Sequence, residues 1–267
     1  MDFWAVLAAE LAAWSVERPA TLWWRDDDTA APGPSLDRLL RLSADAAAPL
    51  ALAVVPRDMA PDLRASLAQA PQAMVIQHGY AHVNHAPTVA GAGAWELGPH
   101  RPTGEVADEL SLGLDQLRES FGPRFHPILV PPWNRIDDAV VRLLPGLGYA
   151  GLSLFGPRPA AEAAGRLRLV NTHYDPIHWR KGRRFTGLDF AAIDLVGHLR
   201  QRRLGEVEDE PTGILTHHWA LDDEAWRFLE ALIPRLQRCP TARLLPATEV
   251  FHINGLDSSR VPALGTP

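Results

Sequence analysis

The stretch TLWWRDDD, residues 21–28, joins a short apolar run to three consecutive carboxylates. An apolar run that ends in polar residues is typical of a strand buried in a parallel sheet. The same succession recurs along the chain, with helical patterns between the runs. We expect eight strands, at Thr21–Arg25, Leu50–Pro56, Met74–Gln77, Ile128–Pro131, Gly151–Phe155, Leu167–Asn171, Gly213–Thr216 and Ala242–Leu245.

Helical patterns separate most of these runs. Leucines and other apolar residues, three and four positions apart, follow Ser35, Thr103 and Asp222, and each of these three residues is expected to cap a helix. Another helix should begin near Asp137 and end at Pro145. About eight strand–helix units predict an α/β fold of the (β/α) barrel type, with a distorted barrel as the expected form and an open doubly wound sheet as the alternative.

The composition is that of one globular domain, with 46% apolar and 22% charged residues in a chain of 267. We expect a single catalytic domain over residues 1–257 and a flexible tail over 258–267. A net charge of −6 disfavours binding to nucleic acid. No apolar stretch approaches the ~20 residues of a membrane span, so no membrane partner is expected. Asp2 and Glu10 interrupt what would be an export signal, which predicts a cytoplasmic protein.

Polar residues gather directly after the predicted strands. In a parallel barrel all these places lie on one face, at the carboxyl ends of the strands, where active sites are built. The clusters are RDDD at 25–28, HGYAH at 78–82, WNR at 133–135, HYD at 173–175 and HH at 217–218. Five clusters that reach one face independently predict a shared site.

The residue types in these clusters indicate metal chemistry. His78 and His82 are four residues apart, so a helical turn would present both imidazoles to one ion; the alternative is a pair of surface histidines. A carboxylate from the Asp cluster would complete a set that leaves positions open for water and substrate. His85 would support the site or substitute as a ligand. His217 or His218 would protonate a leaving group, or else serve as a buried core histidine.

The order of the motifs resembles that of the polysaccharide deacetylases with a NodB-type domain, carbohydrate esterase family four. That family has five motifs, and the resemblance spans residues 21 to 220. The matching stretches are Asp-Asp within Arg25–Asp28, His78 with His82, VPPW at 130–133, DPIHW at 175–179 and LTH at 215–217. The resemblance implies a metal-dependent hydrolase that removes an N-acetyl or O-acetyl group from a carbohydrate or a sugar-containing metabolite.

The resemblance also implies the metal ligands and the base. Asp27 would be the base, and Asp28, His78 and His82 would bind a divalent metal. Zn²⁺ is the first choice, with Co, Mn, Fe or Ni as alternatives. Because three Asp residues are consecutive, Asp26 and Asp27 form an alternative base and ligand pair.

Further residues take roles by the same resemblance. His217 would be the general acid and Asp175 would orient it. The oxyanion and substrate would be bound by Trp133, Arg135, Trp179 and His218.

Three positions depart from the family pattern. Val130 stands where the family has the Arg that holds the base, and Arg25 or Arg135 are candidates to replace it. His178 and His218 stand where the family has Asp. These departures keep two alternatives open: a carbohydrate-binding pseudoenzyme on the same fold, and a metal hydrolase that acts on another small amide.

Overall fold

A curved parallel sheet forms the centre of the computed structural model, which describes residues 2–68, 70–89, 91 and 93–253. The strand order is β10-β1-β2-β3-β4-β5-β6, and β9 pairs with β1 as well. Every pair in this sheet is parallel. The strands are β1 (Ala20–Thr29), β2 (Leu50–Val54), β3 (Ala73–His78), β4 (Phe125–Val130), β5 (Gly151–Leu152), β6 (Arg168–Leu169), β9 (Thr212–Thr216) and β10 (Ala242–Leu244). All eight predicted strands are present, and the predicted distorted barrel is confirmed.

The ring of strands closes irregularly between β6 and β9. The chain beyond β6 approaches β9 through a single parallel bridge between Tyr174 and Ile214. The amide of His173 adds a 2.7 Å hydrogen bond to the carbonyl of Gly213. The barrel is therefore distorted on the side where His173–Asp175 and His217 leave their strands.

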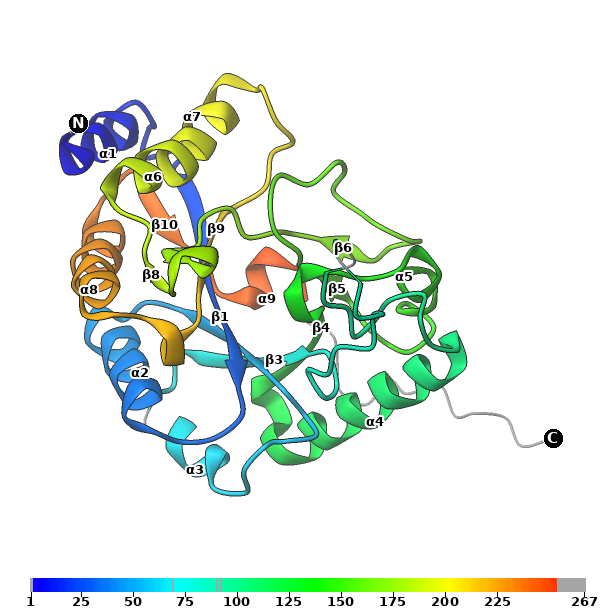
Figure 1. Ribbon diagram of the computed structural model, residues 1–267. Helices are drawn as coiled ribbons and strands as arrows, with labels where there is room; N and C mark the ends of the chain where they lie inside the picture. The colour runs from blue at the N-terminus through cyan, green and yellow to red at the C-terminus, as the bar shows by residue number, and fades with distance from the viewer. Residues whose placement is uncertain (1, 69, 90, 92, 254–267) are drawn as a thin grey trace.

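Helices form an outer layer around this ring, and the short α9 lies within it (Figure 1). They are α1 (Phe3–Ala12), α2 (Pro34–Ala46), α3 (Leu63–Leu67), α4 (Thr103–Phe121), α5 (Asp138–Leu143), α6 (Leu188–Ala191), α7 (Gly197–Leu204), α8 (Asp223–Arg238) and α9 (Ala247–Val250). A π-helical segment, Ala192–Val196, joins α6 to α7. In the described part of the chain, no helix combines the length and apolar character needed to cross a bilayer.

Helix starts agree with the sequence predictions in part. Asp222 caps α8 by accepting a 2.8 Å hydrogen bond from the amide of Ala225, as predicted. The predicted caps Ser35 and Thr103 are wrong, because both lie inside their helices. A proline explains each difference: Pro34 opens α2 with its preset backbone angle, and Pro102 occupies the cap of α4.

The alternation of side chains along β1 sets up the polar face of the barrel. Trp23 packs inside the ring, whereas Leu22 and Trp24 pack outside it under the helices. A strand has a side-chain period of two, so Arg25 and Asp27 follow Trp23 into the ring and Asp26 points outward. The predicted tail, 258–267, lies outside the described residues. A two-stranded hairpin, β7 (Ile177–His178) with β8 (Arg184–Phe185), was not predicted.

Candidate active site

The end of β1 brings Asp27 and Asp28 to the same cavity, although they are neighbours on a strand. Strict alternation would send them to opposite faces. Asp28 has a left-handed backbone, with φ at 65°, and the pairing of β1 with β2 shifts between Asp26 and Thr29. Both carboxylates therefore line a cavity of about 720 Å³. Asp26 is not among the lining residues, which favours Asp27 and Asp28 over the alternative pair.

Asp28, His78 and His82 form a candidate metal centre. The Oδ1 atom of Asp28 lies 2.9 Å from Nε2 of His78 and 3.2 Å from Nε2 of His82. Their potential ligand atoms all lie within 4.8 Å of one another. Nδ1 of His78 lies 3.0 Å from the carbonyl of Val130, which only accepts hydrogen bonds, so Nδ1 carries a proton and Nε2 is the ring nitrogen that faces the centre.

Electrostatics keep the Asp28 carboxyl ionised. Burial acts to raise its pKa, but the hydrogen bonds with His78 and His82 outweigh burial and hold the pKa of Asp28 well below its ordinary value. A carboxylate and two imidazoles on one face form the donor set that binds Zn²⁺ and neighbouring divalent metals. The chemistry of these residues therefore fits a divalent cation.

The helical turn predicted for the two histidines is wrong. His78 ends β3, and His82 lies in a loop with φ at 53°. The fully buried Glu96 shapes this loop. Its carboxylate accepts hydrogen bonds from the amides of Tyr80, Ala81 and His82, at 3.0, 2.6 and 3.1 Å. Sequence reasoning missed Glu96, because no periodic pattern marks a lone acidic residue in a loop.

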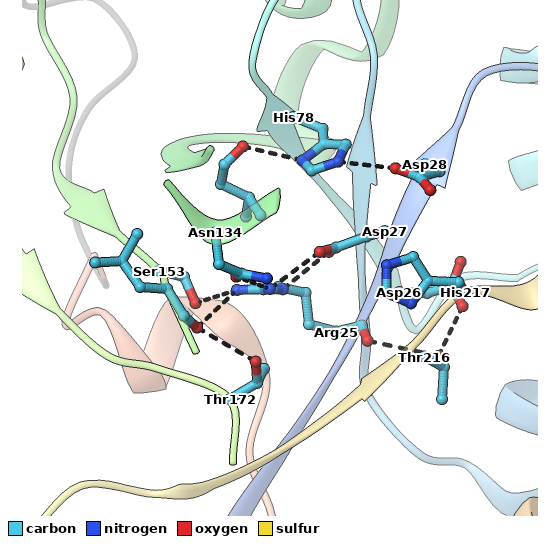
Figure 2. A network of polar contacts seen from close by, with 12 residues as sticks. Arg25, Asp26, Asp27, Asp28, His78, Asn134, Ser153, Thr172, Thr216 and His217 are labelled. Carbon is cyan, nitrogen blue, oxygen red and sulfur yellow. Dashed lines mark hydrogen bonds and ion pairs between the residues drawn. The ribbon is translucent and has the colours of Figure 1, made fainter. Parts of the chain in front are cut away.

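Arg25 holds Asp27 from inside the barrel (Figure 2). Its Nε lies 2.8 Å from Oδ1 of Asp27, and its Nη2 donates to Oδ2 at 3.0 Å. The rest of the guanidinium donates to Asn134 Oδ1 at 2.7 Å and to Ser153 Oγ at 2.6 Å. The Arg25 side chain is fully buried, so its charge depends on Asp27 for compensation.

Two other residues nominated from the sequence lie outside the cavity: Arg135, as a partner of Asp27, and His85, as a supporting or substitute metal ligand. Arg135 does not reach Asp27, because its guanidinium lies over the ring of Trp95, 5.7 Å from the centroid. His85 is exposed, and its Nε2 lies 3.3 Å from Arg101 Nη1. Of the two candidate arginines, Arg25 is therefore the one that contacts Asp27, and His85 lies away from the candidate metal centre.

His217 and Asp175 lie next to each other in the same cavity as Asp27 and Asp28. His217 follows β9, and its Nδ1 lies 3.8 Å from Oδ2 of Asp175. The same Oδ2 accepts a 2.8 Å hydrogen bond from Nε1 of Trp179, whose ring meets His217 edge-on at 4.7 Å. Burial raises the pKa of Asp175 above its ordinary value.

His218 points away from this cavity and pairs with the outward-facing Asp26. Its Nδ1 lies 2.5 Å from Oδ1 of Asp26, and its amide donates to Oδ2 at 3.0 Å. The contact raises the pKa of His218 in spite of its burial. The sequence expectation that His218 binds substrate is therefore not supported by its position.

The loop after β4 presents a free backbone donor. Trp133 has φ at 56°, and its amide donates no hydrogen bond to another residue in the described parts of the chain. Its ring lies 4.5 Å from that of His82. Left-handed backbones concentrate at this face, which is common where a site fixes its groups at the expense of local strain. Besides Asp28, they occur at His82, Trp133, Asn134 and Arg183.

A second group of potential ligands is buried at the other end of β9. It consists of His173, His198 and Glu210. Nδ1 of His173 accepts from the amide of Gly213, so Nε2 carries the proton that faces Glu210. The two imidazoles are stacked 3.5 Å apart and tilted by only 16°, so their in-plane lone pairs do not converge on one ion. This group is a hydrogen-bonded core cluster as it stands.

Comparison with solved structures identifies the architecture. A peptidoglycan N-acetylglucosamine deacetylase superposes with a TM-score of 0.57 at 13% identity, over 90% of this chain and 91% of that one. A putative polysaccharide deacetylase from Mycobacterium smegmatis gives 0.57 at 16% identity, over 90% and 94%. The chain has the polysaccharide deacetylase fold. Neither the protein-family models nor the curated proteins gave a match.

The deacetylase fold occurs in enzymes and in inactive proteins. A CE4 family pseudoenzyme from Bacillus anthracis also superposes, with a TM-score of 0.54 at 13% identity, over 87% of this chain and 66% of that one. Identities this low establish the fold alone. The chemistry must therefore be argued from the residues of the cavity.

Proposed function

We propose that this protein is a metal-dependent deacetylase that hydrolyses an N-acetyl or O-acetyl group on a carbohydrate or a sugar-containing metabolite. The observation that carries the proposal is that a donor set for a metal, a held carboxylate and a histidine–carboxylate pair line one cavity. Eight of the ten residues nominated from the sequence lie there: Asp27, Asp28, His78, His82, Trp133, Asp175, Trp179 and His217.

Asp28, His78 and His82 would hold the cation, with Zn²⁺ as the first choice. A divalent cation supplies Lewis acidity for polarising an acetyl carbonyl and for acidifying water. The centre uses three protein groups, which is the number typical of catalytic rather than structural zinc sites.

Asp27 is the proposed base. A carboxylate offers about four lone-pair positions, so an Asp27 held by Arg25 still has a position for the proton of an attacking water. The guanidinium also keeps the Asp27 side chain in one orientation, which a base requires.

His217 is the proposed acid and Trp133 the proposed oxyanion donor. With Nδ1 of His217 turned toward Asp175, the other ring nitrogen is left to protonate the departing amine or alcohol. The 3.8 Å separation from Asp175 is looser than a hydrogen bond, and such contacts commonly tighten when substrate binds. The unpaired amide of Trp133 would donate to the oxygen that gains charge.

The pseudoenzyme alternative is weakened by Arg25. Loss of the family's arginine at Val130 would leave a base without its partner, but here the guanidinium of Arg25, on β1, contacts both carboxylate oxygens of Asp27. A hydrolase that acts on another small amide would use the same groups. The range of substrates in the experiment below distinguishes such a hydrolase from a sugar deacetylase.

The test is acetate release by the zinc-loaded protein. Wild type is compared with His78→Ala and with His85→Ala, an exposed histidine of the same segment that lies outside the cavity. We expect acetate from wild type and His85→Ala, and only background from His78→Ala. Substrates are acetylated chito-oligosaccharides, N-acetylglucosamine phosphates and non-sugar acetamides.

Two outcomes contradict the proposal. Equal rates for His78→Ala and wild type would remove the metal centre from the reaction. A wild-type protein that binds zinc stoichiometrically but releases no acetate from any acetylated sugar would be a pseudoenzyme or a hydrolase of another amide.

A further inference from the structure

Four cations stand at the tip of the β7–β8 hairpin. The sequence RKGRR occupies residues 180–184 of a chain whose net charge is −6. Arg180, Lys181, Arg183 and Arg184 are all exposed, and none forms an ion pair with a carboxylate of the described chain. Unpaired cations this close together repel one another, so their clustering requires an external partner or a purely solvated role.

The hairpin is fixed to the body of the protein. The ring of Phe185 packs on Phe228 of α8, with centroids 5.1 Å apart. The amide of Phe185 donates to Asp222 Oδ2 at 2.9 Å, and the amide of Thr186 donates to the carbonyl of Pro176 at 2.8 Å. The basic tip is therefore held in place beside α8 (Figure 1).

The position in which the tip is held is the rim of the cavity. Arg183 lines the cavity, and its guanidinium lies over the ring of Trp219, 4.9 Å from the centroid. Trp219 in turn donates its indole N–H to Asp28 at 3.1 Å. One aromatic ring thus separates a free guanidinium from the candidate metal centre.

The carboxylates that line the cavity form no ion pairs with these cations. Asp27 is neutralised by Arg25, and Asp28 faces two imidazoles. Asp175 accepts from Trp179. Among the described lining residues, Asp194 of the π-helical segment is the one carboxylate without a partner, and burial raises its pKa. The guanidinium of Arg183 at the rim therefore has no carboxylate partner among the described lining residues.

We propose that the tip, Arg180–Arg184, binds an anionic group, a carboxylate or a phosphate, on the acetylated substrate. The substrate class is then an acidic sugar rather than a neutral glycan. This inference rests on the proposed function. A guanidinium already in contact with the Trp219 ring loses less freedom when it pairs with a carboxylate or with phosphate oxygens.

Kinetics on matched substrates test the proposal. The neutral substrate is N,N′,N″,N‴-tetraacetylchitotetraose. The anionic substrates are N-acetylglucosamine 6-phosphate and an N-acetylglucosamine–glucuronate tetrasaccharide, which separate phosphate from carboxylate. For wild type we expect the higher kcat/KM on an anionic substrate and a steep decline of that preference with added salt.

The variant Arg180→Gln/Lys181→Gln/Arg183→Gln removes three charges from the tip. The matched control, Arg41→Gln/Arg142→Gln/Arg238→Gln, removes three exposed charges from α2, α5 and α8, so both variants have the same net charge. We expect the tip variant to lower the ratio of kcat/KM for the anionic over the neutral substrate by about fivefold or more, as three exposed ion pairs would. The control should keep the wild-type ratio, and zinc content should be equal in all three proteins.

A binding measurement separates this inference from the proposed function. Calorimetry with the glucuronate tetrasaccharide and zinc-loaded protein requires no turnover. If wild type releases no acetate but binds the tetrasaccharide more tightly than the tip variant does, the function fails and the anion site stands. The inference would be overturned if the tip variant kept both the wild-type ratio of kcat/KM values and the wild-type affinity for the tetrasaccharide. It would also be overturned if the control variant lost as much of that ratio as the tip variant does. Tighter binding of duplex DNA than of either acidic sugar would overturn it as well.

Discussion

The indole Nε1 of Trp219 donates a 3.1 Å hydrogen bond to Oδ2 of Asp28. Because Oδ2 is engaged in this way, the other oxygen, Oδ1, is the one that faces His78 and His82. The indole thus orients the carboxylate so that it offers one oxygen to a cation. Replacing a group that orients a metal ligand in this manner typically costs about 10–100-fold in metal affinity.

Trp219→Phe should therefore weaken metal binding by about tenfold, because it keeps an aromatic ring and removes only the donor. The measurement is a zinc competition titration against a chromophoric chelator. Trp179→Phe is the matched control, since its indole donates to Asp175 instead. Affinity should be unchanged in that control, and equal affinities for Trp219→Phe and wild type would contradict the orienting role.

The positions of Arg25 on β1 and Val130 on β4 predict that an arginine moved from position 25 to position 130 can still hold Asp27. Val130 is fully buried at the end of β4 and packs with Trp23 inside the ring that Arg25 enters from β1. Arg25→Met should lower kcat by about 10²-fold or more by releasing the base. It should also destabilise the protein by about 3–5 kcal/mol, because a buried carboxylate loses its partner.

The double variant Arg25→Met/Val130→Arg should regain part of both losses, since the guanidinium returns from the strand on which the family has it. Urea unfolding and acetate release are measured on the same samples. Arg25→Met/Asp27→Asn is the control: it should regain stability without activity. If Asp27→Asn alone keeps wild-type kcat, Asp27 only neutralises Arg25 and is not the base.

Sequence alone could predict the strands and the face on which the polar clusters meet, because buried parallel strands have a simple apolar signature. It could not decide among the three Asp residues, since the choice depends on the left-handed backbone at Asp28. It could not find Glu96, which acts through contacts 14 to 16 residues away. Nor could it assign Arg25, whose partners Asn134 and Ser153 are more than 100 residues distant.

The acid role of His217 predicts a dependence on the leaving group. His217→Gln should lower kcat by about 10²–10⁴-fold on acetamides, whose amine must be protonated to depart. On 4-nitrophenyl acetate the loss should be much smaller, because nitrophenolate leaves without a proton. Zinc affinity serves as the control and should be unchanged. Equal losses on both substrates would contradict a role as proton donor.

The stacked pair His173 and His198 predicts a loss of stability in acid. His198 is buried, with Nδ1 near Thr212 and Nε2 without a partner in the described chain. Burial, together with the positive potential of His173 and Arg202, lowers the pKa of His198 to about 2. Burial also lowers the pKa of His173.

The sign follows from proton binding. Below the ordinary histidine pKa of about 6.5 the unfolded chain binds a proton that the folded protein does not, so the free energy of unfolding falls by about 1.4 kcal/mol per pH unit for one such group. His198→Asn keeps a side chain able to bond Thr212 but cannot titrate. Urea unfolding between pH 7 and pH 5 should give a flatter profile for His198→Asn than for wild type. The exposed His100→Asn should keep the wild-type slope, and parallel profiles for wild type and His198→Asn would show that His198 is protonated in the folded protein.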